Sequence, residues 1–441
     1  MSVESEARFN SVMVAICDIN GSYRGKRLPF SQIDKVFSGS LRMPLSASTV
    51  DIWGRDIEGS ELVFESGDGD GVCRPLRDEI VPSPWLGEGS GFLPLCLYEE
   101  SGEPHAGDPR NALSAVVARY AEKGLRPVVA TELEFYLADI SEDADSLTEG
   151  VAVPKFAAEN VLSVQDLEEM GPFLDDVYAA CEVCGIRADA AISETGVGQF
   201  EINLLHTDDP VRAADDALMF KRIVKGCARA HGRSATFMAK PHGESAGSGL
   251  HVHFSLLNEA GENVFDDGTD EGSDVMLSAV AGLTTAMPES TLLFAPHLNS
   301  YRRLRPETHA PTLVAWGYEN RTAAIRIPGG SNKARRIEHR VSGADANPYL
   351  VLTAILGAAL EGIEANLKPP APLVGNAYNS DLPDIPSDWS LAINAFEEGE
   401  VMKKIFDPML LQLIVQAKRQ EMQRFLETVT EFEYQTYLEV V

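Results

Sequence analysis

The chain has 441 residues, with 37 Lys and Arg against 67 Asp and Glu, so its formal charge at pH 7 is −30. This excess of negative charge repels phosphate backbones and anionic lipid surfaces, and no Lys- and Arg-rich stripe reverses it locally, which argues against nucleic-acid and membrane-surface functions. The composition is 44% hydrophobic, enough for a large buried core.

No apolar run reaches the roughly 20 residues that a membrane-spanning helix needs, and the longest, at residues 350–363, contains Glu361. Residues 1–6 lack the basic start and apolar middle of a signal peptide, which predicts a cytoplasmic protein with reduced cysteines. Cys181 and Cys184 have the spacing of a metal-binding pair. Because no second Cys or His pair lies at zinc-site distance, we expect both to be core residues.

The first predicted elements are short apolar runs at residues 12–17 and 61–64, separated by Gly, Pro and Asp turns. This pattern predicts a small mixed sheet. The polar segment 99–108 then leads to a helix that begins at an Asp-Pro pair. We therefore expect two domains, residues 1–107 and residues 108–441.

The second domain is predicted to mix strands with long helices. One helix is expected over residues 173–184. Another begins at Asp209 as N-cap, with Pro210 in its first turn, and ends at Gly232. A Pro-rich connection follows at residues 369–386.

Four predicted strands of this domain carry charged residues. The strands cover residues 127–137, 198–204, 248–255 and 334–340. Successive side chains of a strand point to opposite faces, so each strand gathers its charges on one face. These residues are Glu132 and Glu134; Glu201; His251 and His253; and Arg336, Glu338 and Arg340. A solvated sheet face would tolerate one such pair, but in three of the strands the opposite face is clearly apolar, and the repetition favours a site.

Glu194 precedes the second of these strands across a glycine-containing loop. If the charged faces converge, five glutamates and His251 share one site, and that many carboxylates cannot stay ionised without cations. Oxygen ligands with a single imidazole favour Mg²⁺ or Mn²⁺ over zinc. We therefore expect two or three divalent ions.

Five arginines follow in the same part of the chain, although the chain as a whole is acidic. They are Arg303, Arg321, Arg326, Arg336 and Arg340. Separate surface ion pairs would explain any one of them but hardly all five. Forked guanidinium donors beside Mg²⁺ suit ATP and a transferring phosphoryl group. The glycine-rich segment 67–71 is acidic and lacks the Lys-Ser/Thr of a phosphate-binding loop, so we interpret it as a turn.

Several segments resemble the glutamine synthetase family, in the order in which that family has them. They are residues 131–135, 198–201, 247–253, 299–303, 320–328, 334–340 and 346–349. The resemblance implies an α+β fold, with a small N-terminal β-grasp domain and a catalytic domain built on a curved antiparallel sheet with helices. It also implies a homododecamer whose active sites lie between subunits.

The resemblance further implies a role for each matching residue. Glu134, Glu194 and Glu201 would hold one metal, and Glu132, His251 and Glu338 the other. L-Glutamate would be bound by Gly247, Arg303, Arg321 and Arg340, with Arg321 also catalytic. ATP would be bound by His253, Ser255, Arg326, Lys333 and Arg336. In the implied reaction the γ-carboxylate of glutamate attacks the γ-phosphate of ATP, and an amine then displaces phosphate from the γ-glutamyl phosphate.

Three departures from the family's pattern bear on the amine. The flap glutamate of the ammonia-using enzymes, six residues after Arg303, is replaced by His309, and their Asp-Gly-Ser-Ser loop is replaced approximately by residues 43–46. An Asn before Gly247 is also replaced, by Ala246. Loss of both ammonium-binding carboxylates weakens a pocket for so small a cation and suits an alkyl group. His309 is a candidate catalytic base, and a flap histidine without a chemical role is the alternative.

These changes resemble the γ-glutamylpolyamine synthetase branch. Our leading hypothesis is an ATP-dependent ligase that joins glutamate to a polyamine or alkylamine. The alternatives are an ammonia-using glutamine synthetase and a catalytically silent sensor of nitrogen metabolites. Tyr378 lies near the regulatory adenylylation loop of some family members, but its surroundings match poorly and we do not expect that modification.

Overall fold

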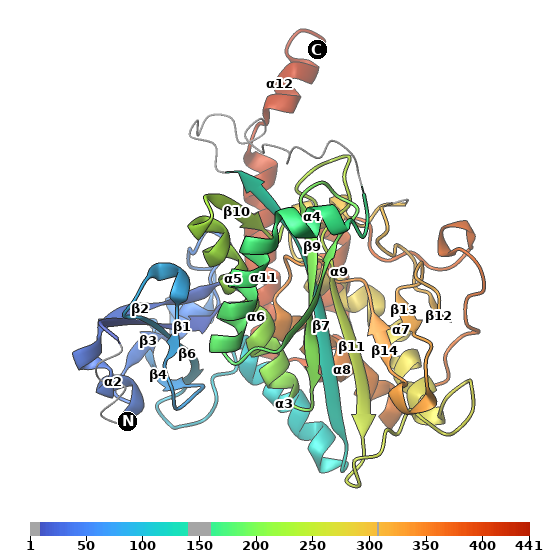
Figure 1. Cartoon of the computed structure of the whole chain (residues 1–441), viewed down its shortest axis with the longest axis horizontal. Helices are drawn as coiled ribbons and strands as arrows, with labels where there is room; N and C mark the ends of the chain where they lie inside the picture. Colours follow the sequence, from blue (N-terminus) through green and yellow to red (C-terminus); the bar gives the residue numbers. More distant parts are fainter. Residues whose placement is uncertain (1–8, 140–159, 307) are drawn as a thin grey trace.

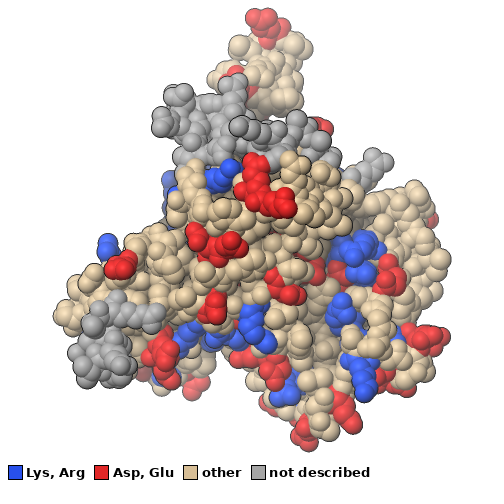
Figure 2. Space-filling model, in the orientation of Figure 1, with Lys and Arg blue, Asp and Glu red and all other residues tan. Residues whose placement is uncertain are grey.

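The computed structural model describes residues 9–139, 160–306 and 308–441. Its strands form two sheets, of six and eight strands, that follow one another along the chain (Figure 1). Acidic and basic side chains are interspersed on the face that Figure 2 shows. No helix among the described residues is long and apolar enough to cross a membrane.

The N-terminal sheet is mixed, as predicted. Its strands are β1 (Ser11–Cys17), β2 (Tyr23–Pro29), β3 (Arg42–Pro44), β4 (Asp70–Pro75), β5 (Val81–Pro82) and β6 (Ser90–Tyr98). The order is β2-β1-β6-β4-β3, with β5 also paired to β6, and β1 runs parallel to β6. The short helix α2 (Asp34–Phe37) buries Val36 in the same core as Val12 and Val14.

The apolar run at residues 61–64 does not contribute to this sheet, so its predicted place there is wrong. Glu61–Glu65 forms a π-helical turn, η3. Leu62 is buried, whereas Phe64 is 66% exposed. Within this turn only Leu62 is buried.

Short helical turns connect the strands and helices elsewhere. They are the 3-10 helices η1 (Phe30–Gln32), η2 (Leu45–Ser48), η4 (Pro84–Leu86), η5 (Leu298–Arg302), η6 (Asn332–Ala334) and η7 (Ala377–Asn379).

The second sheet is curved and almost entirely antiparallel, which confirms the fold that the resemblance implies. Its strands are β7 (Arg126–Asp139), β8 (Ala188–Ser193), β9 (Gln199–Thr207), β10 (Arg233–Thr236), β11 (Leu250–Leu257), β12 (Trp316–Tyr318), β13 (Ile325–Ile327) and β14 (Ile337–His339). The order is β12-β13-β14-β11-β7-β9-β8, with β10 paired to β7, and only the β12–β13 pair is parallel among the described pairs.

Helices cover the apolar face of this sheet (Figure 1). The helices in this part of the chain are α3 (Pro109–Glu122), α4 (Val164–Glu169), α5 (Gly171–Val183), α6 (Pro210–Ala230), α7 (Asp274–Phe294), α8 (Pro348–Glu364), α9 (Trp389–Glu398), α10 (Met402–Ile405), α11 (Pro408–Glu427) and α12 (Glu431–Tyr437). Helices α3, α5 and α6 contact strands of the sheet, whereas α12 stands away from it (Figure 1). The ring of Phe135 on β7 contacts Phe173 on α5 and Phe220 on α6. This packing buries one face of the sheet and leaves the other face to polar side chains.

Helix starts agree closely with the sequence prediction. The carboxylate of Asp108 accepts a hydrogen bond from Arg110 N at the start of α3, and that of Asp209 accepts from the backbone at the start of α6. Cys181 and Cys184 are buried free thiols, as predicted.

The two sheets share a core. Ala15 and Cys17 of β1 belong to the same buried cluster as residues of the second sheet and its helices. The domain boundary near residue 107 stays a prediction.

Candidate active site

Charged side chains lie in a row across the face of the second sheet that the helices leave uncovered. The strand register sets three pairs side by side on neighbouring strands: Glu134 and Glu201, Glu132 and His251, and His253 and Glu338. Arg326 of β13 lies beside Glu338 at the end of the row. Glu194 follows the last residue of β8. The predicted convergence of these charged faces is therefore seen in the structure.

Two adjoining cavities contain the predicted site residues. The first has a volume of about 770 Å³ and is lined by all six predicted metal ligands together with Gly247, His253, Arg303, His309, Arg321, Arg326, Arg336 and Arg340. The second, of about 730 Å³, is lined by Ser255 and Lys333. Both cavities share Glu132, Asn203, His253 and Arg336, which therefore mark the junction.

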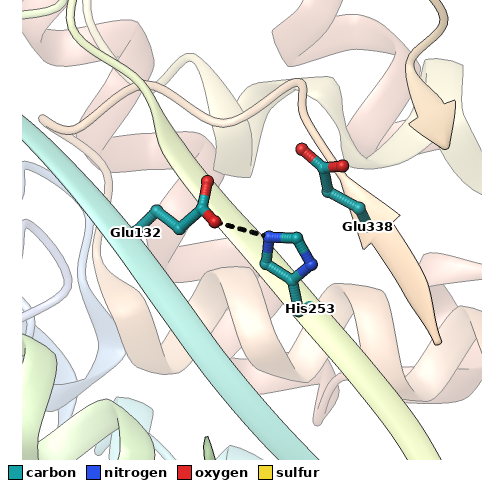
Figure 3. Close-up of side chains that lie close together, drawn as sticks. All are labelled: Glu132, His253 and Glu338. Atoms are coloured by element: carbon teal, nitrogen blue, oxygen red, sulfur yellow. Dashed lines mark hydrogen bonds and ion pairs between the residues drawn. The ribbon is translucent and has the colours of Figure 1, made fainter. Parts of the chain in front are cut away.

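Among the residues that the structure describes, three groups of side chains bring potential metal ligands within 4.8 Å of one another. They are Glu134, Glu194 and Glu201; Glu132, Glu201 and His251; and Glu132, His253 and Glu338. Figure 3 shows the last group, with its three residues on β7, β11 and β14. The first group matches one predicted metal set. Glu338, by contrast, is grouped with His253, whereas the resemblance pairs it with His251, and the division of ligands between ions stays a prediction.

Crowding of negative charge perturbs two of these glutamates. Burial, reinforced by the charges of Glu132, Glu134 and Glu194, raises the pKa of Glu201 to about 9. Burial and the charge of Glu134 raise the pKa of Glu194 to about 7. A divalent cation would relieve this repulsion, and carboxylate oxygens with imidazole nitrogens are suitable ligands for Mg²⁺ or Mn²⁺. The donor set therefore fits such ions.

Two other glutamates are held ionised by their neighbours. Burial would raise the pKa of Glu132, but hydrogen bonds with His251 and His253 lower it well below its usual range. Glu132 Oε1 lies 2.9 Å from His253 Nε2, and Glu132 Oε2 lies 3.2 Å from His251 Nδ1. Arg336 Nε donates to His253 Nδ1 at 3.3 Å, which leaves His253 Nε2 as the donor to Glu132.

Glu338 lies between two arginines. Arg326 donates to one of its oxygens at 2.8 Å, and Arg340 donates to the other. Burial would raise the pKa of Glu338, but the positive charge of Arg340, the nearby imidazoles of His251 and His253 and the hydrogen bond from Arg326 lower it to about 2. This carboxylate is thus an anion at any physiological pH.

The four predicted glutamate-binding residues, Gly247, Arg303, Arg321 and Arg340, all line the first cavity. Arg303 and Arg340 are buried, and Arg303 donates to the carbonyl of Val341 at 2.7 Å. The site needs a glycine at position 247, because a Cβ there would lie 2.7 Å from Arg303 Cγ. Arg321 is exposed on the cavity lining.

His309 also lies on the lining of the first cavity and is exposed. Its φ is +62°, a left-handed conformation that is uncommon for residues other than glycine. Ala246 lines the same cavity, and its carbonyl accepts a hydrogen bond of 2.6 Å from the hydroxyl of Tyr136.

Sequence analysis missed three residues that shape the site. Gln199 donates to Glu134 at 3.1 Å and to the carbonyl of Gly247 at 2.9 Å. Asn203 lies opposite Glu132 and lines both cavities. Gln199 and Asn203 lie two residues on either side of Glu201 in β9, so strand alternation places all three on one face. The sequence therefore did indicate that these two residues belong to the site. Tyr378, which the sequence analysis considered only as a modification site, lines the first cavity from η7.

Comparison with known proteins identifies the family that the sequence motifs resemble. Residues 106–437 match the family model described as "Glutamine synthetase, catalytic domain". A gamma-glutamylputrescine synthetase from Escherichia coli (strain K12) is 38% identical over 97% of this chain and 91% of its own length. A glutamate–isopropylamine ligase from a Pseudomonas species is 32% identical over 98% of this chain and 95% of its own length.

A solved structure described as "Apo GmaS without ligand" superposes with a TM-score of 0.86 at 27% identity, covering 99% of this chain and 98% of that one. The sequence match and the structural match both extend over nearly the whole chain. The chain therefore belongs to the glutamine synthetase family, and within it is similar to the γ-glutamylpolyamine synthetase branch.

Proposed function

We propose that this protein is an ATP-dependent ligase that joins the γ-carboxylate of L-glutamate to an alkylamine or polyamine. The main support is the row of carboxylates and imidazoles across the second sheet, flanked by arginines and lying at the junction of two cavities. The family ascription supports glutamate ligase chemistry. His309 and Ala246 on the cavity lining support an amine other than ammonium.

Glu132, Glu134, Glu194, Glu201 and Glu338, with His251 and His253 beside them, would hold two or three Mg²⁺ or Mn²⁺ ions. Such ions, when bound, would offset the charge of the transferring phosphoryl group. Their binding at this place is supported by the raised pKa of Glu201, which reflects burial reinforced by the charges of the neighbouring carboxylates.

The second cavity would hold ATP, with Ser255, Lys333 and Arg336 toward its phosphates and the γ-phosphate at the junction. The first cavity would hold glutamate between Arg303 and Arg340. A γ-carboxylate oxygen then attacks the γ-phosphorus, the bond to the bridging oxygen breaks, and ADP leaves. Arg321 and Arg326 would stabilise the charge on the equatorial oxygens.

In the second step the amine nitrogen forms a bond to the acyl carbon, the bond from that carbon to the oxygen bridging it to phosphorus breaks, phosphate leaves with this oxygen, and the nitrogen loses a proton. His309 is our candidate to accept this proton, because it lies on the cavity lining and imidazole titrates near neutral pH. The alternative is that His309 lines the cavity without a chemical role.

The test measures phosphate release with glutamate, Mg²⁺ and ATP against a panel of ammonium, methylamine, isopropylamine, ethanolamine, putrescine and spermidine. We expect at least one alkylamine or polyamine to give a higher kcat/KM than ammonium. An ordinary glutamine synthetase would instead use ammonium at least as well as every other amine, and that result would refute the proposal.

The same panel on His309→Glu sharpens the test. A carboxylate at this position favours a small cation, so we expect the ratio of ammonium use to alkylamine use to rise by about tenfold, the effect of roughly 1.4 kcal/mol. Mass spectrometry of the γ-glutamyl product identifies the amine that was joined.

We further propose that the active protein is a homododecamer with its sites between subunits. Apolar side chains exposed near the C-terminus, on α12 and the end of α11, support an assembly that covers them: Leu426, Val429, Phe432, Tyr434, Tyr437 and Leu438. In Figure 1, α12 stands away from the body of the molecule. Sedimentation velocity checks this, because a monomer of 47.8 kDa and a twelvefold assembly differ greatly in mass.

A further inference from the structure

A strap formed by residues 375–385 connects two loops that carry site residues. Asn320 Nδ2 donates to the carbonyl of Gly375 at 2.7 Å, and Ala377 N donates to Thr322 Oγ1 at 2.9 Å, on either side of Arg321. At its other end the strap exchanges backbone hydrogen bonds with residues 312–314. These contacts tie the strap to the loop of Arg321 and to residues 308–314, here named the His309 loop.

Tyr378 is the strap residue whose side chain lines the first cavity. Its hydroxyl donates to the carbonyl of Ala310 at 2.8 Å. The ring is half-buried and close enough to Arg303 and Arg340 to feel their charge, but burial outweighs them and raises the pKa of Tyr378. The hydroxyl therefore remains a neutral donor at physiological pH.

The hydrogen bond from Tyr378 acts directly on the backbone beside His309. The carbonyl that accepts it belongs to Ala310, the next residue, which is buried. His309 itself has a φ of +62°, a conformation that residues other than glycine keep only where surrounding contacts hold it. The hydrogen bond from Tyr378 restrains the peptide group between Ala310 and Pro311, one residue beyond His309. It thus helps to hold the His309 side chain at the cavity.

We infer that Tyr378 is a positioning residue that keeps the His309 loop closed over the first cavity and so decides whether amine or water reaches the acyl phosphate. This inference rests on the proposed function. With the loop held, the amine nitrogen forms the bond to the acyl carbon and phosphate leaves. With the loop released, a water oxygen forms that bond instead, which returns glutamate and phosphate and wastes one ATP.

The test uses Tyr378→Phe, which removes the hydroxyl and keeps the ring. The readout is the coupling ratio, the amount of γ-glutamylamide formed per phosphate released, with putrescine as the amine. We expect the ratio to fall at least twofold and the KM for putrescine to rise about five- to tenfold, the usual effect of one neutral hydrogen bond. The KM for ATP should change by less than about twofold.

Tyr98→Phe is the matched control, because Tyr98 lies on β6 of the N-terminal sheet under Arg74, away from both cavities. It should keep the wild-type coupling ratio. Asn320→Ala loosens the strap at Gly375 from outside the cavities, and we expect it to lower the coupling ratio in the same direction as Tyr378→Phe.

Wild-type coupling and an unchanged KM for putrescine in both Tyr378→Phe and Asn320→Ala would overturn the inference while leaving the proposed function intact. A uniform rise in the KM of all three substrates, with a melting temperature lowered by several degrees, would also overturn it, since that pattern indicates a general structural role. No amine-dependent phosphate release by the wild-type protein would refute the proposed function itself.

Discussion

Individual side chains in this site are held in charge states that oppose what burial alone would produce. Glu132 and Glu338 are kept ionised by two histidines and two arginines. For Glu201, a few ångströms away, burial and the charges of neighbouring glutamates outweigh the charge of Arg340 and raise the pKa. The site thus combines two fixed anions with two carboxylates, Glu194 and Glu201, whose ionisation further positive charge would favour.

Glu338 offers the sharpest test of an enzyme against a silent sensor. Glu338→Gln removes a candidate metal ligand and leaves Arg326 and Arg340 without their shared anion, so we expect kcat for phosphate release to fall at least about 100-fold. The exposed Glu79 provides the control variant, Glu79→Gln, with wild-type turnover expected. A Glu338→Gln protein with near-normal turnover would remove this residue from the proposed machinery.

Lys221 gives stability a pH dependence that does not involve the site. Burial, with the charge of Lys225, lowers its pKa from 10.5 to about 7, and its ammonium donates to the carbonyl of Ala346 at 2.7 Å. Between pH 7 and pH 10.5 the unfolded chain binds a proton that the folded chain lacks. The free energy of unfolding therefore rises with pH in this window, by at most about 1.4 kcal/mol per unit.

Urea denaturation of the wild type and of Lys221→Met at pH 7, 8 and 9 checks this. The variant should lose this part of the increase, while Lys35→Met, at an exposed position of α2, should follow the wild type. Parallel stability curves for all three proteins would contradict the expectation.

Among the secondary-structure elements, the helices of the second domain mostly begin where a capping side chain accepts from the backbone. Asp209 accepts from Val211 N at 3.1 Å and from Arg212 N at 3.0 Å at the start of α6. This helix buries most of its length against the sheet that carries the site. Loss of the capping hydrogen bonds at its first turn should therefore lower the stability of the whole domain.

Asp209→Ala removes this cap, and we expect it to lower the free energy of unfolding by about 1 kcal/mol. The neighbouring Asp208 makes an exposed ion pair with Arg126, so Asp208→Ala is a control with an expected effect below about 0.5 kcal/mol. Thermal denaturation of both variants measures the difference. Equal losses in the two would show that the cap adds no specific stability.

At the scale of the whole molecule, one sheet separates two environments. Its apolar face packs against helices, and its charged face collects residues from β7, β9, β11 and β14, which lie far apart in the sequence. Cations bound there would link these strands in the folded state only. Metal binding should therefore stabilise the whole second domain.

We expect Mg²⁺ or Mn²⁺ at 100 times its dissociation constant to raise the free energy of unfolding by about 2.7 kcal/mol for each independent site, seen as a higher melting temperature that EDTA reverses. Glu201→Gln removes an oxygen ligand common to two of the three candidate groups and should abolish most of the increase. Glu259→Gln, at an exposed turn, should retain it. A melting temperature insensitive to both cations would contradict the proposed metal site.

Alternation along single strands is enough to predict that Glu132 and Glu134, or His251 and His253, share a face, because strand geometry repeats every two residues. Helix starts at Asp108 and Asp209 are likewise local, since a cap bonds to backbone two or three residues away. The resemblance of short motifs then predicts the family and which residues belong to the site.

Local signals of this kind do not determine which distant segments pair with one another. Which histidine stands beside Glu338 depends on the register of β11 against β14. The bond from Tyr378 to Ala310 joins residues 68 positions apart, and residues 61–65 form a helical turn although their apolar run predicts a strand. Local chemistry selects which faces are buried, but the relative placement of those faces follows from packing the complete chain.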